Sequence, residues 1–90
     1  MRLKDDYLLH DTGNGEILLA VGEATKNFHG IIKLNETGAK IAHMLKDKDC
    51  SLEEIEKQFF EEYPDEDKEI ISSSIKEFIA VLEGADAILR

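Results

Sequence analysis

The sequence predicts an α+β fold, in which a three-stranded antiparallel sheet is followed by three helices. The first third of the chain is rich in leucine and β-branched residues and is broken by turn residues, as expected for short strands. From residue 35 onwards, the apolar residues recur every three or four positions, which is the period of a buried helical stripe. Because 90 residues suffice for one modest core, we expect a single domain over residues 1–90.

Two short segments are predicted to open the sheet as a hairpin. They are YLLH (residues 7–10) and EILLAV (residues 16–21), and the stretch between them is DTGNG. The two glycines of this stretch and Asn14 suit the positive φ angles that a hairpin loop requires.

The third predicted strand is HGIIKL, residues 29–34. Its alternate residues fall on opposite faces, with Gly30, Ile32 and Leu34 on one face and His29, Ile31 and Lys33 on the other. As the last strand before the helices, it is expected at an edge of the sheet, where unpaired backbone groups can accept another strand.

Asn35 is a good N-cap for the first helix, whose buried stripe is Gly38, Ile41, Ala42 and Leu45. A glycine inside a helix costs about 1 kcal/mol relative to alanine. We therefore expect Gly38 to permit a close approach of this helix to the sheet or to a neighbouring helix.

The second helix is predicted to begin with a capping box formed by Ser51 and Glu54, and to end at Pro64. Its apolar stripe is Leu52, Ile55, Phe59 and Tyr63.

The third helix is expected to follow its N-cap Asp67 and to end at Gly84, a suitable C′ residue. Its core stripe is Ile71, Ile75, Phe78, Ile79 and Leu82, and a mixed stripe beside it consists of Ile70, Ser74, Glu77 and Val81. The tail ADAILR is apolar enough to pack as a short extended piece. Three helices beside a small sheet resemble a winged helix-turn-helix.

The charge of the chain excludes some partners. The net charge is −9, and residues 51–69 alone carry nine acidic and two basic residues, a net of −7. Binding to nucleic acid requires Lys and Arg to neutralise phosphates, so this balance argues against a DNA or RNA partner despite the winged-helix likeness. The N-terminus MRLKDDYLL is too charged for a signal peptide, and no apolar run is long enough to span a membrane, which predicts a cytoplasmic protein.

No group of residues has the pattern of a catalytic or metal site. Cys50, in the polar stretch KDKDCSLEE, is interpreted as a surface thiol without a neighbouring base. His10, His29 and His43 lack the spacing of metal ligands, and the glycines match no phosphate-binding motif. We therefore expect no catalysis, no metal and no cofactor.

The edge strand and the mixed stripe of the third helix together suggest a groove that captures an extended peptide by strand addition. The alternative is that Ile31 and the mixed stripe are ordinary core or exposed apolar surface. The residues alone leave both interpretations open.

Three stretches of the chain resemble the PqqD family, the pyrroloquinoline quinone biosynthesis protein D family. Its fold is the recognition element of ribosomally synthesised and modified peptides (the RiPP recognition element). The stretches are VGEATKNFHGIIKLNETGAKIAHML, SLEEIEKQFFEEY and IKEFIAVLEGADAI. The most specific part is LNETG followed by an apolar helix.

The resemblance implies a small peptide chaperone that binds the leader segment of a ribosomally made precursor peptide. In that family the leader adds to the third strand, lies against the third helix, and is presented to a modifying enzyme, often a radical S-adenosylmethionine enzyme. Carried over to this sequence, the peptide-binding residues are Gly30, Ile31, Ile32 and Lys33 on the strand, and Ser74, Glu77, Phe78 and Val81 on the helix. The resemblance does not imply quinone cofactor synthesis itself.

We therefore expect a non-catalytic peptide-recognition module whose partners are a precursor leader peptide and a modifying enzyme. The alternative is an acidic interaction or regulatory domain that docks a basic protein through its second helix. Because an open edge can also pair with a second copy, the sequence leaves monomer and homodimer open.

Overall fold

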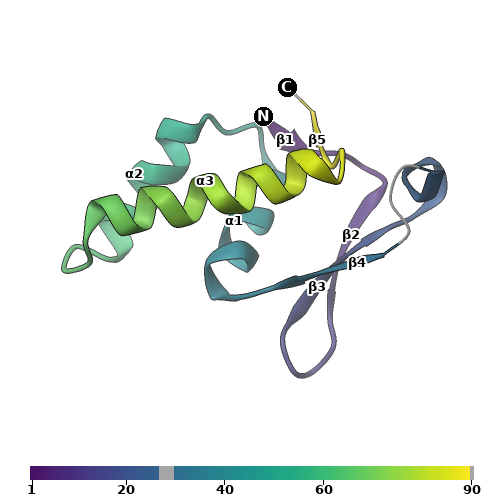
Figure 1. The fold of residues 1–90 in the computed structure, drawn as a ribbon, viewed down its shortest axis with the longest axis horizontal. Helices are drawn as coiled ribbons and strands as arrows, with labels where there is room; N and C mark the ends of the chain where they lie inside the picture. The colour runs from purple at the N-terminus through teal and green to yellow at the C-terminus, as the bar shows by residue number, and fades with distance from the viewer. Residues whose placement is uncertain (27–29, 90) are drawn as a thin grey trace.

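Strands occupy the first third of the chain and helices the rest, as the change of apolar period predicts. The computed structural model describes residues 1–26 and 30–89. Its elements are β1 (Arg2–Leu3), β2 (Tyr7–Asp11), β3 (Glu16–Ala20), the 3-10 helix η1 (Gly22–Lys26), β4 (Ile31–Leu34), α1 (Glu36–Asp47), α2 (Leu52–Glu62), α3 (Lys68–Gly84) and β5 (Ile88–Leu89) (Figure 1). The predicted antiparallel sheet followed by three helices is confirmed. The winged helix-turn-helix likeness stays a prediction.

The main sheet has the order β2-β3-β4, with both pairs antiparallel. Leu18 of the central strand pairs with Leu9 on one side and with Ile32 on the other. In the hairpin loop, Gly13 (φ 89°) and Gly15 (φ 125°) take the predicted positive φ angles. The same expectation for Asn14 is wrong, because its φ is not positive.

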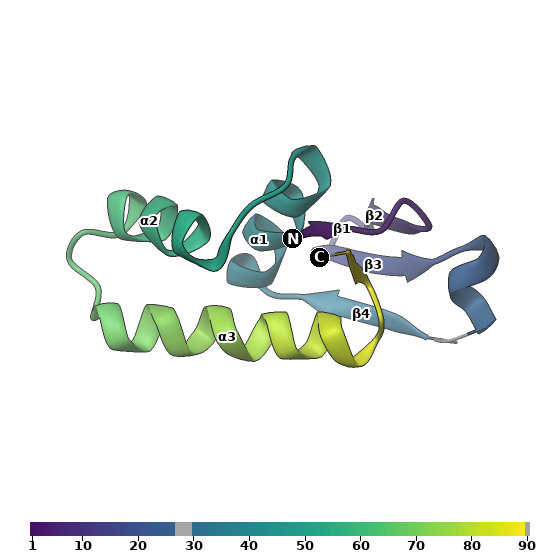
Figure 2. The ribbon, with the colours of Figure 1, turned by 90° about the horizontal axis from the view of Figure 1, so that it is seen from above.

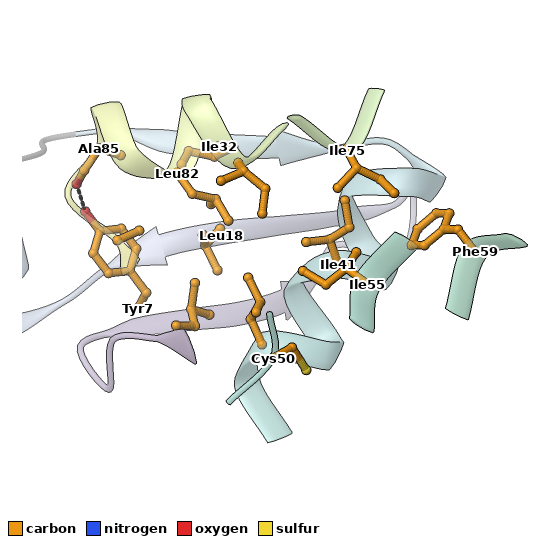
Figure 3. Close-up of a cluster of buried hydrophobic side chains, with 14 of the residues drawn as sticks. Tyr7, Leu18, Ile32, Ile41, Cys50, Ile55, Phe59, Ile75, Leu82 and Ala85 are labelled. Atoms are coloured by element: carbon orange, nitrogen blue, oxygen red, sulfur yellow. Dashed lines mark hydrogen bonds between the residues drawn. The ribbon is translucent and has the colours of Figure 1, made fainter. Parts of the chain in front are cut away.

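A second, two-stranded sheet joins the two ends of the described chain. Leu3 of β1 pairs with Ile88 of β5, and the ends lie close together (Figure 1). The extended tail is therefore confirmed, whereas β1 and η1 were not predicted. Next to this sheet, the hydroxyl of the buried Tyr7 donates a hydrogen bond of 2.5 Å to the carbonyl of Ala85 (Figure 3).

One hydrophobic core lies between the main sheet and the three helices (Figure 3). Its largest fully buried side chains come from the sheet, from every helix and from one loop: Leu18, Ile41, Leu45, Ile55, Ile75, Leu82 and Cys50. The predicted N-caps are confirmed, since Asn35, Ser51 and Asp67 each accept a hydrogen bond from a backbone N–H of the helix that follows.

Gly38 is a point of close approach between α1 and α3. It is buried in the first turns of α1, where its N–H donates a hydrogen bond of 2.7 Å to Oδ1 of Asn35. A Cβ at this position would lie 2.8 Å from Cε1 and 3.1 Å from Cδ1 of Phe78 on α3. The expected close approach is therefore found, and its partner is the Phe78 ring.

Cys50 is not a surface thiol, so that interpretation is wrong. It is 1% exposed and belongs to the core. Its backbone N–H donates to the carbonyl of Met1 (2.7 Å), and the Met1 amino group donates to the Cys50 carbonyl (2.9 Å). The N-terminal segment therefore covers the polar stretch in which Cys50 lies, and burial raises the pKa of its thiol.

The third helix ends at Gly84, as predicted, but the C′ role assigned to this glycine is wrong. Gly84 belongs to α3 and Ala85 is its C-cap. The left-handed conformation expected at Gly84 occurs instead at Asp86 (φ 56°). Aspartate tolerates this conformation better than most residues, because its short side chain can hydrogen-bond locally.

Substitution of Gly38 by alanine should lower the free energy of unfolding by about 1 kcal/mol. Overpacking against Phe78 costs about 1–3 kcal/mol, and the higher helix propensity of alanine offsets about 1 kcal/mol of this. Urea denaturation followed by circular dichroism measures the change. Gly84→Ala is the matched control, because a Cβ there would meet no neighbour within 4 Å and should leave stability unchanged or slightly raised. Equal stabilisation by both substitutions would contradict the close approach.

The Cys50 thiol should be protected in the folded protein. Because the side chain is buried and its thiol pKa is raised, a thiol reagent should modify it about a hundredfold more slowly than in the urea-unfolded chain. The rate of reaction with Ellman's reagent, with and without urea, checks this. Equal rates in both conditions would show that the thiol is accessible after all.

Candidate functional site

The free edge of β4 lies beside α3. Among the described strands, β2 and β4 are the two outer strands of the main sheet. Figure 2 shows α3 running alongside β4, with β2 on the far side of β3. A strand that joined the sheet at β4 would therefore have α3 next to it, as the predicted groove requires.

The hairpin register decides which way the backbone groups of β3 point. The N–H of Thr12 donates to the carbonyl of Gly15 (2.9 Å), and the N–H of Val21 donates to the carbonyl of Asp6 (2.8 Å). In an antiparallel pair, hydrogen-bonded and non-hydrogen-bonded positions alternate. By this alternation from both ends of the hairpin, Leu9 and Leu18 form a non-hydrogen-bonded pair. Leu18 therefore directs its N–H and C=O away from β2 and towards β4.

The same alternation identifies the backbone groups at the free edge of β4. Ile32 pairs with Leu18 and therefore directs its N–H and C=O towards β3. Ile31 and Lys33 occupy the alternate positions and direct theirs outwards. No strand in the described part of the chain pairs with β4 on this side. Two residues thus offer their backbone to an incoming strand.

One flank of α3 faces the start of α1, directly after β4. Phe78 establishes this direction, since its ring lies against Gly38. Ser74, Val81 and Ile70 share the flank, because they lie four, three and eight residues from Phe78. Ile70 is 65% exposed and Val81 is 50% exposed, so the described part of the chain leaves much of both side chains uncovered. The flank therefore presents apolar surface on the side where the peptide is expected.

The predicted site residues fall into three groups. Ile31 and Lys33 are exposed at the edge, and Gly30 is exposed just before it. On α3, Glu77 and Val81 are exposed, and Ser74 and Phe78 are partly buried. Ile32 differs from these, because its side chain is in the core and its backbone faces β3. His29, with which the predicted strand begins, lies outside the described residues.

A small hollow continues the α3 flank beyond the end of β4. It has a volume of about 200 Å³ and lies between the start of α1, the end of α2 and the first half of α3. Its lining residues are Glu36, Thr37, Phe59, Tyr63, Glu66, Ile70, Ile71 and Ser74. Sequence periodicity assigns Ile70 and Ser74 to the mixed stripe, but only tertiary packing brings the residues of α1 and α2 to them.

A larger hollow of about 800 Å³ lies elsewhere, between the hairpin loop and α1. Four of its charged or titratable side chains are already paired with one another. His43 Nε2 lies 2.7 Å from Oε2 of Glu16, and the Lys40 ammonium is hydrogen-bonded to Glu62. That bond lowers the pKa of the Glu62 carboxyl and raises the pKa of Lys40. We place the candidate site at β4 rather than here, because β4 has outward backbone groups beside an uncovered apolar flank.

Residues 1–26 and 30–89 contain no group of three or more His, Cys, Asp or Glu side chains placed to hold a metal ion. Within the same ranges, no helix has the length and apolar character needed to cross a membrane.

Comparison with known proteins identifies the family. The family model for coenzyme PQQ synthesis protein D (PqqD) matches residues 9–88, a range that includes β4 and all three helices. No curated protein and no solved structure matches the chain. Since the matched residues span most of its 90 positions, the chain belongs to the PqqD family.

Proposed function

We propose that this protein is a non-catalytic module that binds the leader of a ribosomally synthesised precursor peptide. The leader adds to the sheet as a further strand along β4 and contacts the exposed flank of α3. The module then presents the peptide to a modifying enzyme of the radical S-adenosylmethionine class. Family membership supports the role in peptide modification, and the expected cytoplasmic location stays a prediction.

The observation that carries this proposal is the outward backbone of Ile31 and Lys33 beside α3. An unpaired edge alone is a risk of aggregation rather than a site. Here the apolar flank that includes Phe78 and Val81 lies where the side chains of an added strand would need a partner. Backbone hydrogen bonds would provide part of the affinity, and the flank would provide the specificity.

The same geometry suggests how the peptide is presented. Strand addition would hold a short segment of the leader, since β4 itself has four residues. The rest of the precursor would remain outside the sheet and accessible to a second protein. A recognition module with no catalytic residues of its own can therefore serve an enzyme that acts on a different part of the peptide.

Ile31→Pro should weaken peptide binding by at least about tenfold, because it removes an outward N–H and distorts the edge. The domain should stay folded, since proline is tolerated at strand edges whose N–H faces solvent. The probes are synthetic peptides that correspond to any short reading frames found beside this gene. Fluorescence anisotropy measures their affinity, and at least one is expected to bind at about micromolar affinity or tighter.

Ile31→Thr is the matched control for this substitution. It retains the N–H and the β-branched shape and should keep most of the binding. Circular dichroism of both variants confirms that they are folded. If the folded proline variant binds the peptide as well as the wild type does, β4 is not the site.

Charge reversal on α2 separates this function from the acidic docking domain. Glu53 and Glu61 are exposed, whereas Glu56 is partly buried and accepts a hydrogen bond from the Ser72 hydroxyl. The double substitution of Glu53 and Glu61 by lysine should therefore leave the fold intact and change peptide affinity by less than about twofold, since both carboxylates are exposed and screened. A large loss in the same titration would instead favour docking through α2.

A further inference from the structure

We propose that the hollow beyond β4 is a specificity pocket for one apolar side chain of the bound peptide that has a lysine or arginine next to it. We call it the α1–α3 pocket, and its eight lining residues are those given above. The proposal rests on the proposed function, because the occupant is the part of the peptide that flanks the segment paired with β4.

The inner surface of the α1–α3 pocket is apolar. Phe59 and Ile71 are buried at its base, and the ring of Tyr63 lies 6.0 Å from that of Phe59, centre to centre. Ile70 lies on the side and is 65% exposed, the largest exposure among the large hydrophobic residues described. A volume of about 200 Å³ accommodates one aliphatic or aromatic side chain, whose burial would also cover Ile70.

The charge at the rim selects the neighbouring residue of the peptide. Glu36 and Glu66 are the only charged residues among the eight that line the pocket, and both are exposed. Lys40 lies 5.0 Å from the centre of the Tyr63 ring but is paired with Glu62. Within residues 1–26 and 30–89, neither rim carboxylate has an ion-pair partner. A cation in the peptide complements this rim, whereas an aspartate or glutamate is repelled by it.

The position of the pocket connects it to the peptide edge. Glu36 follows the last residue of β4, Leu34, by two positions, and Ser74 belongs both to the pocket and to the α3 flank. A peptide that leaves the free edge at this end of β4 therefore passes directly over Ile70. The pocket and the edge form one continuous surface for a single extended chain.

The test uses a displayed library of random linear dodecapeptides, selected on the full chain. The wild type should enrich peptides that combine an apolar residue with an adjacent or next-but-one Lys or Arg. The pocket variant Glu36→Lys/Glu66→Lys should enrich Asp or Glu at that position. It should also bind the wild-type-selected peptides about tenfold more weakly, the size expected from turning two exposed attractive charge pairs into repulsive ones.

A control variant matches this change in net charge and, at one of its two positions, the place in a helix. Glu53→Lys/Glu61→Lys alters the net charge equally and, like the pocket variant, removes an acidic residue from the first turn of a helix. It should select the same peptides as the wild type. For the apolar contact, Ile70→Ser should weaken binding, while Leu8→Ser, which changes a 44% exposed leucine on the sheet, should not.

The outcomes distinguish the two proposals. If Ile31→Pro selects the same peptides as the wild type, or the wild type enriches none, the proposed strand addition fails. If the enriched peptides depend on Ile31 but bind the pocket variant and Ile70→Ser unchanged, the α1–α3 pocket is refuted and strand addition stands. A shift of the preferred charge in the pocket variant alone supports the pocket.

Discussion

The packing of the Phe78 ring against Gly38 determines where α3 lies relative to β4. A strand, a helix start and a second helix meet at this point, because Asn35 both follows β4 and caps α1 through the Gly38 N–H. The absence of a side chain at Gly38 leaves the space that the ring occupies. The width of the surface between the edge and the α3 flank therefore depends on one missing methyl group.

Features that depend on local pattern could be predicted from the sequence. Alternation in β4 correctly separated Ile32, which is buried, from Ile31 and Lys33, which are exposed. The N-caps Asn35, Ser51 and Asp67 were recognisable because each side chain bonds a backbone group only two or three residues away. The close approach at Gly38 was also predicted, but Phe78 was not identified as the residue that makes the contact.

Features that depend on contacts between distant segments could not be predicted. Cys50 lies in a polar stretch, and its burial follows from backbone hydrogen bonds to Met1, 49 residues away. The two-residue strand β1 has no pattern of its own and exists through its pairing with β5. The α1–α3 pocket is lined by residues of three helices and of the loop between α2 and α3. The apolar stripe of any one helix therefore does not predict it.

The short free edge of β4 has a consequence for the lifetime of a complex. Two outward residues offer two N–H and two C=O groups, each contributing a net of about 0.5–1.5 kcal/mol. A micromolar complex requires about 8 kcal/mol, so side-chain contacts with α3 must supply much of the affinity. At an ordinary association rate constant of about 10⁶ M⁻¹ s⁻¹, such a complex dissociates in about one second. A carrier with this residence time would hand its peptide to an enzyme and release it without a separate ejection step.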